Sequence, residues 1–161
     1  MIVLGLDPGL RSTGWGTILI EENRLSYQDS GLIKTSEKLP LAERLAYLFQ
    51  ELTKIIHQQS PEEVAVEETF VNKNPESSLK LASARGVVLC APAVLGLLVV
   101  TYAPNYIKKN LLGYGHADKN QVAWAVQQIL KLKNPPKKDA ADALGLAICH
   151  SYAKSSHKSL F

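Results

Sequence analysis

Two acidic side chains close short apolar runs, a position where an ionised carboxylate can do chemistry. Asp7 follows residues 2–6 and precedes Pro8-Gly9, and Glu67 follows residues 64–66. An apolar run ended in this way predicts a buried strand, so we expect each acid where a strand leaves the core. An ionised carboxylate there is costly unless positive charge meets it.

Two further acids share one face of a predicted helix. Asp139 and Asp142 begin an alanine-rich segment and are spaced i, i+3, which places them on the same side of a helix. If this helix packs beside the two strand ends, four carboxylates converge, and so many like charges cannot all stay ionised without cations. Carboxylate oxygens suit Mg²⁺ or Mn²⁺.

Each acid taken alone has an ordinary structural explanation, as a turn residue, a strand-end charge or a first-turn helix acid. Their expected convergence favours a metal site instead.

The elements that must position these acids begin with three strands. Residues 2–7, 12–20 and 25–35 predict strands, with a turn at 21–23, so the N-terminal part is expected to be an antiparallel meander. Leucines and isoleucines at helical spacing over residues 41–56 predict a crossover helix, which would feed the strand that ends at Glu67.

The second half alternates between helices and a strand. Asn74-Pro75-Glu76 predicts the start of a helix that runs to about residue 88, and residues 97–102 predict a buried fifth strand. Asp118 with Gln121 predicts a further helix, and the last helix follows Pro135-Pro136. The expected fold is α/β, a mixed five-stranded sheet with the first three strands antiparallel, flanked by helices.

Length and composition limit the domain count. With 161 residues, 46% of them hydrophobic, the chain is expected to form one domain over residues 1–154 and a flexible tail over 155–161. The apolar stretch at 86–100 contains Pro92 and is shorter than the ~20 residues of a membrane span. Two cysteines in apolar surroundings and no secretory signal before the first strand favour a reduced, cytoplasmic setting.

The charge is uneven along the chain. The net charge is +3, but residues 101–161 carry 9 Lys and Arg against 3 Asp and Glu, whereas residues 1–100 carry 9 against 12. A basic C-terminal part beside an acidic site indicates a polyanionic partner, although ordinary solvated lysines would give the same count.

Five blocks of sequence carry a resemblance to one family. They are residues 2–9 with Thr13-Gly14-Trp15-Gly16, residues 65–67 with Phe70, residues 80–86, Gly113-Tyr114-Gly115 with Ala117 and Lys119, and residues 139–144. In this order, over residues 1–152, the chain resembles the RuvC family of bacterial Holliday-junction resolvases.

The resemblance implies a ribonuclease-H-like fold, a homodimer, and paired symmetric nicking of four-way junction DNA in recombination and repair. It also implies two Mg²⁺ ions per active site, with Mn²⁺ as an alternative, and a branch-migration helicase complex (RuvA and RuvB) as partner. The family's catalytic and metal-binding acids fall on Asp7, Glu67, Asp139 and Asp142. We expect Asp7 to bridge the two ions, Glu67 and Asp142 to hold one each, and Asp139 to act as an outer ligand.

DNA contacts are expected from basic and aromatic side chains near the acids. Lys108 and Lys119 match basic positions that the family uses near the cut phosphate, and Phe70 matches an aromatic that stacks on an unpaired base. The predicted DNA-binding residues are Phe70, Lys108, Lys109, Lys119, Lys137 and Lys138. Phe70 could instead close its loop against the core, and Lys137 and Lys138 could simply solvate a loop.

The helix expected over residues 74–88 is rich in small residues and resembles the family's dimer helix. The predicted interface residues are Ser78, Leu81, Ala82 and Arg85. Packing within a single chain is the alternative.

Other functions remain open at this point. A ribonuclease-H-like nuclease acting on RNA or RNA–DNA hybrids would use the same carboxylates. A non-cleaving junction binder is disfavoured by the intact acids. A nucleotide-binding module of the sugar-kinase or actin type is disfavoured by the short chain and the missing second phosphate loop.

Overall fold

The computed structural model describes residues 1–22, 24–69, 73–113 and 119–158, with all side chains in these ranges except those at positions 105, 119 and 156–158. The elements, in chain order, are β1 (Ile2–Asp7), β2 (Ser12–Glu21), β3 (Arg24–Lys34), α1 (Leu41–Gln59), β4 (Glu63–Glu67), α2 (Pro75–Val94), β5 (Leu98–Tyr102), α3 (Pro104–Leu112), α4 (Lys119–Leu130) and α5 (Lys138–Lys158).

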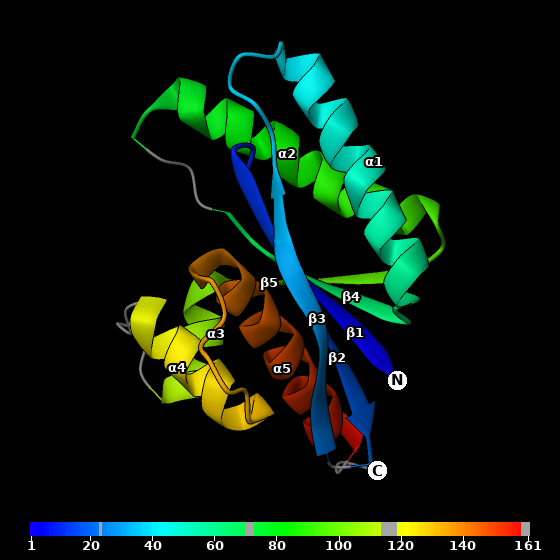
Figure 1. Ribbon diagram of the computed structural model, residues 1–161, viewed down its shortest axis with the longest axis vertical. Helices are drawn as coiled ribbons and strands as arrows, with labels where there is room; N and C mark the ends of the chain where they lie inside the picture. The colour runs from blue at the N-terminus through cyan, green and yellow to red at the C-terminus, as the bar shows by residue number, and fades with distance from the viewer. Residues whose placement is uncertain (23, 70–72, 114–118, 159–161) are drawn as a thin grey trace.

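The strands form one mixed sheet in the order β3-β2-β1-β4-β5. β1, β2 and β3 pair antiparallel, whereas β4 pairs parallel to β1 and β5 parallel to β4. Helices α1 and α2 lie on one side of the sheet, and α3, α4 and α5 lie on the other (Figure 1). The α/β fold with an antiparallel N-terminal meander is confirmed.

β1 is the central strand and is buried on both faces. Leu4 and Leu6, both fully buried, pack with residues of α1 and α2, whereas Val3 packs with residues of α4 and α5. Because side chains alternate along a strand, a strand covered on both sides must be apolar throughout. Asp7 is therefore the point at which this strand leaves the core, as the sequence predicted.

Two glycines let α5 approach the sheet directly. A Cβ atom at Gly5 would overlap the carbonyl oxygen of Ala143, and one at Gly14 would overlap that of Asp139. These positions exclude every other residue unless the helix moves away. The contact fixes the N-terminal end of α5 beside the ends of β1 and β2, and sequence analysis did not find it.

Two expectations about the second half were wrong. β5 is an edge strand and not a buried one, because only β4 pairs with it, and Leu98 is 57% exposed. α2 continues through Pro92 to Val94, since a proline in the last turn removes few helical hydrogen bonds. α5 runs to Lys158, and the flexible tail expected over residues 155–161 stays a prediction. α3 was not predicted at all.

No described helix is both long and apolar enough to cross a membrane.

Candidate active site

A small pocket at the C-terminal ends of β1 and β4 gathers three of the four predicted acids. Its volume is about 140 Å³, and Asp7 of β1, Glu67 of β4 and Asp142 of α5 line it. We call it the acid pocket. β1 and β4 are parallel neighbours with Leu6 opposite Val66, so the residues that follow are brought side by side.

The third acid reaches this edge through the helix that packs on the glycines. α5 begins at Lys138, so Asp142 lies in its first turns, next to the end of β1. The positive end of the helix dipole favours negative charge there. The contact between α5 and the sheet backbone therefore brings Asp142 to the strand ends.

Helices α3 and α4 form the remaining wall. Pro104, Ile107 and Lys108 of α3 and Val122 of α4 line the acid pocket. Lys108 is half-buried and brings a positive charge to the same space as the carboxylates. A cation beside converging acids lowers their mutual repulsion and can hold the phosphate of a substrate.

Asp139, the fourth predicted acid, stands at the margin. It is half-buried one turn before Asp142 and does not line the acid pocket; its backbone oxygen faces Gly14. Its predicted role as an outer ligand stays a prediction.

The acid pocket fits a divalent cation by its chemistry. Three carboxylates supply only hard oxygen donors, the set that suits Mg²⁺ or Mn²⁺. Within the described ranges, however, no three His, Cys, Asp or Glu side chains stand close enough to hold an ion as they are. Side chains of Asp7, Glu67 and Asp142 would therefore have to draw together around it.

The other predicted DNA-binding residues are dispersed. Lys109 is exposed on α3, Lys138 is exposed at the start of α5, and Lys137 lines a separate hollow next to β3. The side chain of Lys119, the first residue of α4, and all of Phe70 lie outside the described residues. Among the predicted lysines whose side chains the structure describes, Lys108 lines the acid pocket and Lys109, Lys137 and Lys138 do not.

Sequence analysis missed a buried polar cluster at the opposite end of β4. His150 of α5 is 4% exposed; its Nε2 lies 2.7 Å from Oε2 of Glu63, and its Nδ1 lies 2.8 Å from the hydroxyl of Tyr102. Lys154 also contacts Glu63. In the sequence, only the adjacent Cys149 and His150 drew attention to this cluster. The structure places His150 beside Glu63 and not in the acid pocket.

The cluster perturbs two pKa values. Burial tends to raise the pKa of Glu63, but hydrogen bonds from Lys154 and His150 outweigh it and hold that pKa below its ordinary value. Burial, with the nearby Tyr106, raises the pKa of Tyr102 to about 12. The group thus holds an ionised Glu63 and a neutral phenol where α5 meets β4 and β5.

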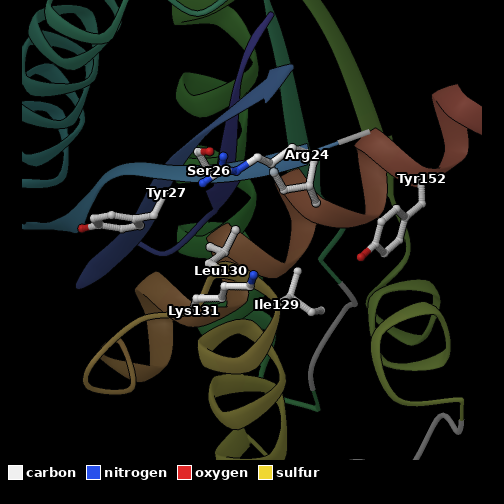
Figure 2. A pocket seen from close by; sticks show the side chains of 8 residues that line it. Arg24, Ser26, Tyr27, Ile129, Leu130, Lys131 and Tyr152 are labelled. Atoms are coloured by element: carbon white, nitrogen blue, oxygen red, sulfur yellow. The ribbon is translucent and has the colours of Figure 1, made fainter. Parts of the chain in front are cut away.

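Figure 2 shows a larger hollow, of about 490 Å³. Arg24 of β3, Lys131 at the end of α4 and Tyr152 of α5 surround it. In the sheet register, Arg24 lies opposite Glu21 of β2, and Asp7 lies opposite Gly14 of the same strand. Glu21 and Gly14 are seven residues apart, which is roughly 23 Å along a strand. This hollow is therefore separate from the acid pocket.

Comparison with known proteins agrees with this geometry. The family model described as crossover junction endodeoxyribonuclease RuvC matches residues 3–150. The chain belongs to the RuvC family. A RuvC from Rhodopseudomonas palustris (strain BisA53) is 50% identical over 150 residues, covering 93% of this chain and 86% of that protein. A RuvC from Xanthobacter autotrophicus is 49% identical over 154 residues, covering 96% and 91%.

Solved structures extend the match to the fold. Thermus thermophilus RuvC in complex with a Holliday junction substrate is 36% identical, covers 97% of this chain and 96% of its own, and superposes with a TM-score of 0.89. The ribonuclease-H-like fold expected from the sequence is thereby confirmed. RuvC proteins are metal-dependent nucleases, and this chain is a crossover junction endodeoxyribonuclease by family.

Proposed function

We propose that this protein resolves Holliday junctions by paired symmetric nicks, through phosphodiester hydrolysis assisted by two divalent ions. The observation that supports this most is the acid pocket, where carboxylates from two parallel strands and one helix meet beside Lys108. Family membership supplies the substrate class, and hydrolysis of a phosphodiester needs negative charge placed where cations can be held. We further propose that it acts in the cytoplasm.

The division of labour follows from position. Asp7 lies on the central strand, which pairs with β4 and is packed against α5, so Asp7 is our choice for the ligand shared by both ions. Glu67 and Asp142 would hold one ion each, and Asp139 would support from outside. Bound Mg²⁺, or Mn²⁺ in its place, would activate a water and stabilise the leaving oxygen. Lys108 would hold the phosphate in place.

Contacts along the DNA are proposed from the remaining basic and aromatic residues. Lys109, Lys119, Lys137 and Lys138 add positive charge on the C-terminal side of the chain, which binds phosphates without reading sequence. Phe70 follows the catalytic strand and would stack on an unpaired base.

A homodimer through α2 would make the two nicks symmetric, because a two-fold axis relates like strands of a junction. Ala82 is exposed, Ser78, Leu81 and Arg85 are half-buried, and the neighbouring Leu79 is 71% exposed. Ala84, in contrast, is fully buried in the chain's own core, so it does not belong to such an interface. Sedimentation of Ala82→Glu should give monomers where the wild type gives dimers. The branch-migration helicase complex is the proposed partner.

The decisive experiment is cleavage of a synthetic four-way junction beside linear duplex and RNA–DNA hybrid, with Mg²⁺ or with EDTA. We expect paired nicks in the junction alone, lost in EDTA and in Asp7→Asn while DNA binding survives. Asp29→Asn, which changes an acid on β3 remote from the acid pocket, is the matched control. Faster cutting of the hybrid would favour the ribonuclease alternative, and binding without cutting would leave a junction-binding protein.

A further inference from the structure

A further hollow opens at the same end of β1 as the acid pocket, on the side of the sheet that α1 and α2 cover. Its volume is about 380 Å³, and Arg11, Arg44 and Lys80 line it together with Glu37 and Ser77. We call it the basic pocket. Arg11 comes four residues after Asp7, in the connection between β1 and β2. The two pockets therefore lie at the same end of the central strand.

Arg44 is the buried charge of the basic pocket. It is 8% exposed, its Nε donates to the Thr35 hydroxyl at 2.9 Å, and its Nη2 donates to the Leu10 carbonyl at 3.4 Å. Across the ranges that the structure describes, no carboxylate forms an ion pair with it. A guanidinium that is buried without a counter-ion is costly, so this position favours an anionic ligand.

Two helix termini add to the positive potential. Arg44 lies in the first turn of α1, and Ser77 lies in the first turn of α2, so the positive ends of two helix dipoles are close to the basic pocket. The start of α1 has no side-chain cap, whereas in α2 the Asn74 side chain already accepts from the N–H groups of Glu76 and Ser77. A helix dipole together with a nearby guanidinium is a favourable setting for a phosphate.

Arg11 and Lys80, at the rim of the basic pocket, each form an exposed ion pair with a glutamate. Arg11 Nε lies 3.7 Å from Glu37, and Lys80 Nζ lies 2.6 Å from Glu76. All four side chains are about half exposed or more, and such ion pairs contribute little in water. DNA, with its many closely spaced phosphates, can compete with either acid for these cations.

We propose that the basic pocket binds a backbone phosphate of the junction DNA, a short distance from the phosphate that is cut. This rests on the proposed function. Four residues separate Asp7 from Arg11 and span at most about 14 Å, while one strand of a duplex carries a phosphate every 3.4 Å of helix axis, so the backbones of the two residues are no more than about four nucleotides apart. A contact of this kind sets the register of the DNA on the acid pocket.

The test measures junction binding against salt concentration, in EDTA, for the full chain and for the variants Arg11→Gln and Lys80→Gln. Each variant is expected to lower affinity about two- to fivefold and to reduce the slope of log K against log salt by about one. Matched controls are Arg24→Gln, an exposed arginine at the other end of the sheet, and Lys54→Gln, whose pair with Glu51 at 2.6 Å copies the Lys80 geometry elsewhere.

Glu37→Gln provides a change of the opposite sign. Removing this acid frees Arg11 for the phosphate, so affinity is expected to rise about twofold. A purely structural role of the rim would not produce tighter binding. Arg44→Gln would also remove the hydrogen bonds to Leu10 and Thr35 and could destabilise the fold. The test therefore uses Arg11→Gln and Lys80→Gln, at the rim of the pocket.

The outcomes separate the two proposals. Slopes that stay at the wild-type value in both Arg11→Gln and Lys80→Gln would overturn the basic pocket as a DNA site, even if junction cleavage is normal. A wild-type protein that neither binds nor cuts junctions would overturn the proposed function and this site with it. Inorganic phosphate could instead raise the melting temperature of the wild type but not of either variant, with the DNA slopes unchanged. That result would show that the pocket binds a free anion and would also overturn the DNA site.

Discussion

β4 carries a glutamate at each end, and the two have opposite surroundings. Glu63, at the start, is 14% exposed at its side chain and is hydrogen-bonded to His150 and Lys154. Glu67, at the end, lines the acid pocket with Asp7 and Asp142. The two residues are identical in type and only four positions apart. Their different roles come from what the neighbouring elements bring to each end.

The two partners of Glu63, Lys154 and His150, come from α5, and the acids beside Glu67 come from β1 and from the opposite end of α5. One helix therefore neutralises a carboxylate at one end of the strand and adds a carboxylate at the other. The ion pair at Glu63 holds the helix and the sheet together. The acids at the other end repel one another, and a metal ion and Lys108 can lower that repulsion. Under the proposed function, stability and chemistry are therefore separated along a single strand.

The largest expected effect is on the catalytic end. Glu67→Gln should lower the rate of junction cleavage about 100-fold or more, because a carboxylate that helps to hold a metal becomes a neutral amide. Its melting temperature should stay close to that of the wild type. Single-turnover cleavage measures the loss, and Glu68→Gln, at the next and exposed position, should cut normally.

A second variant breaks the contact that brings α5 to the sheet. Gly14→Ala would drive a methyl group into the backbone at Asp139, so we expect a loss of about 3 kcal/mol in the free energy of unfolding, together with slower cleavage. Denaturant unfolding measures the change. Gly86→Ala, where an added Cβ meets nothing within 4 Å, is the control and should keep wild-type stability or gain slightly. Equal stability in both variants would contradict the close approach.

A third variant addresses the structural end. Glu63→Gln leaves Lys154 and His150 facing an amide, so it should lower the free energy of unfolding by about 2 kcal/mol while cleavage at saturating DNA and metal is retained. Glu62→Gln, an exposed neighbour, should change stability by much less. A loss of cleavage in Glu63→Gln at full folding would show that the two ends of β4 are not independent.

The smallest expected effect is a dependence of stability on pH. The pKa of Glu63 is lower in the folded protein than in the unfolded chain, so its stabilisation is present above the ordinary value of 4.5 and is lost as the pH falls through the folded value below it. Stability curves for the wild type and Glu63→Gln should therefore converge in acid. A constant difference between them down to pH 3 would contradict the assignment.

Much of the architecture follows from local patterns. The run before Asp7 and the run before Glu67 have no polar residue because strands covered on both faces need none, and this pattern is enough to predict that both acids stand at strand ends. The spacing of Asp139 and Asp142 likewise follows from helical geometry. The edge position of β5, the end of α2 beyond Pro92 and the existence of α3 were not predicted, since pairing and packing with distant residues decide them.

The sequence by itself determined that Asp7 and Glu67 end strands, that Asp139 and Asp142 share a helix face, and which family the motifs resemble, because these properties depend on residues close together in the chain. Only the tertiary structure decided that Asp142 joins Asp7 and Glu67 while Asp139 stays at the margin, that Lys108 lines the same pocket, and that His150 supports Glu63. These outcomes depend on how closely α5 approaches the sheet. Gly5 and Gly14 set that distance through contacts between backbone atoms more than 120 residues apart, which no local pattern records.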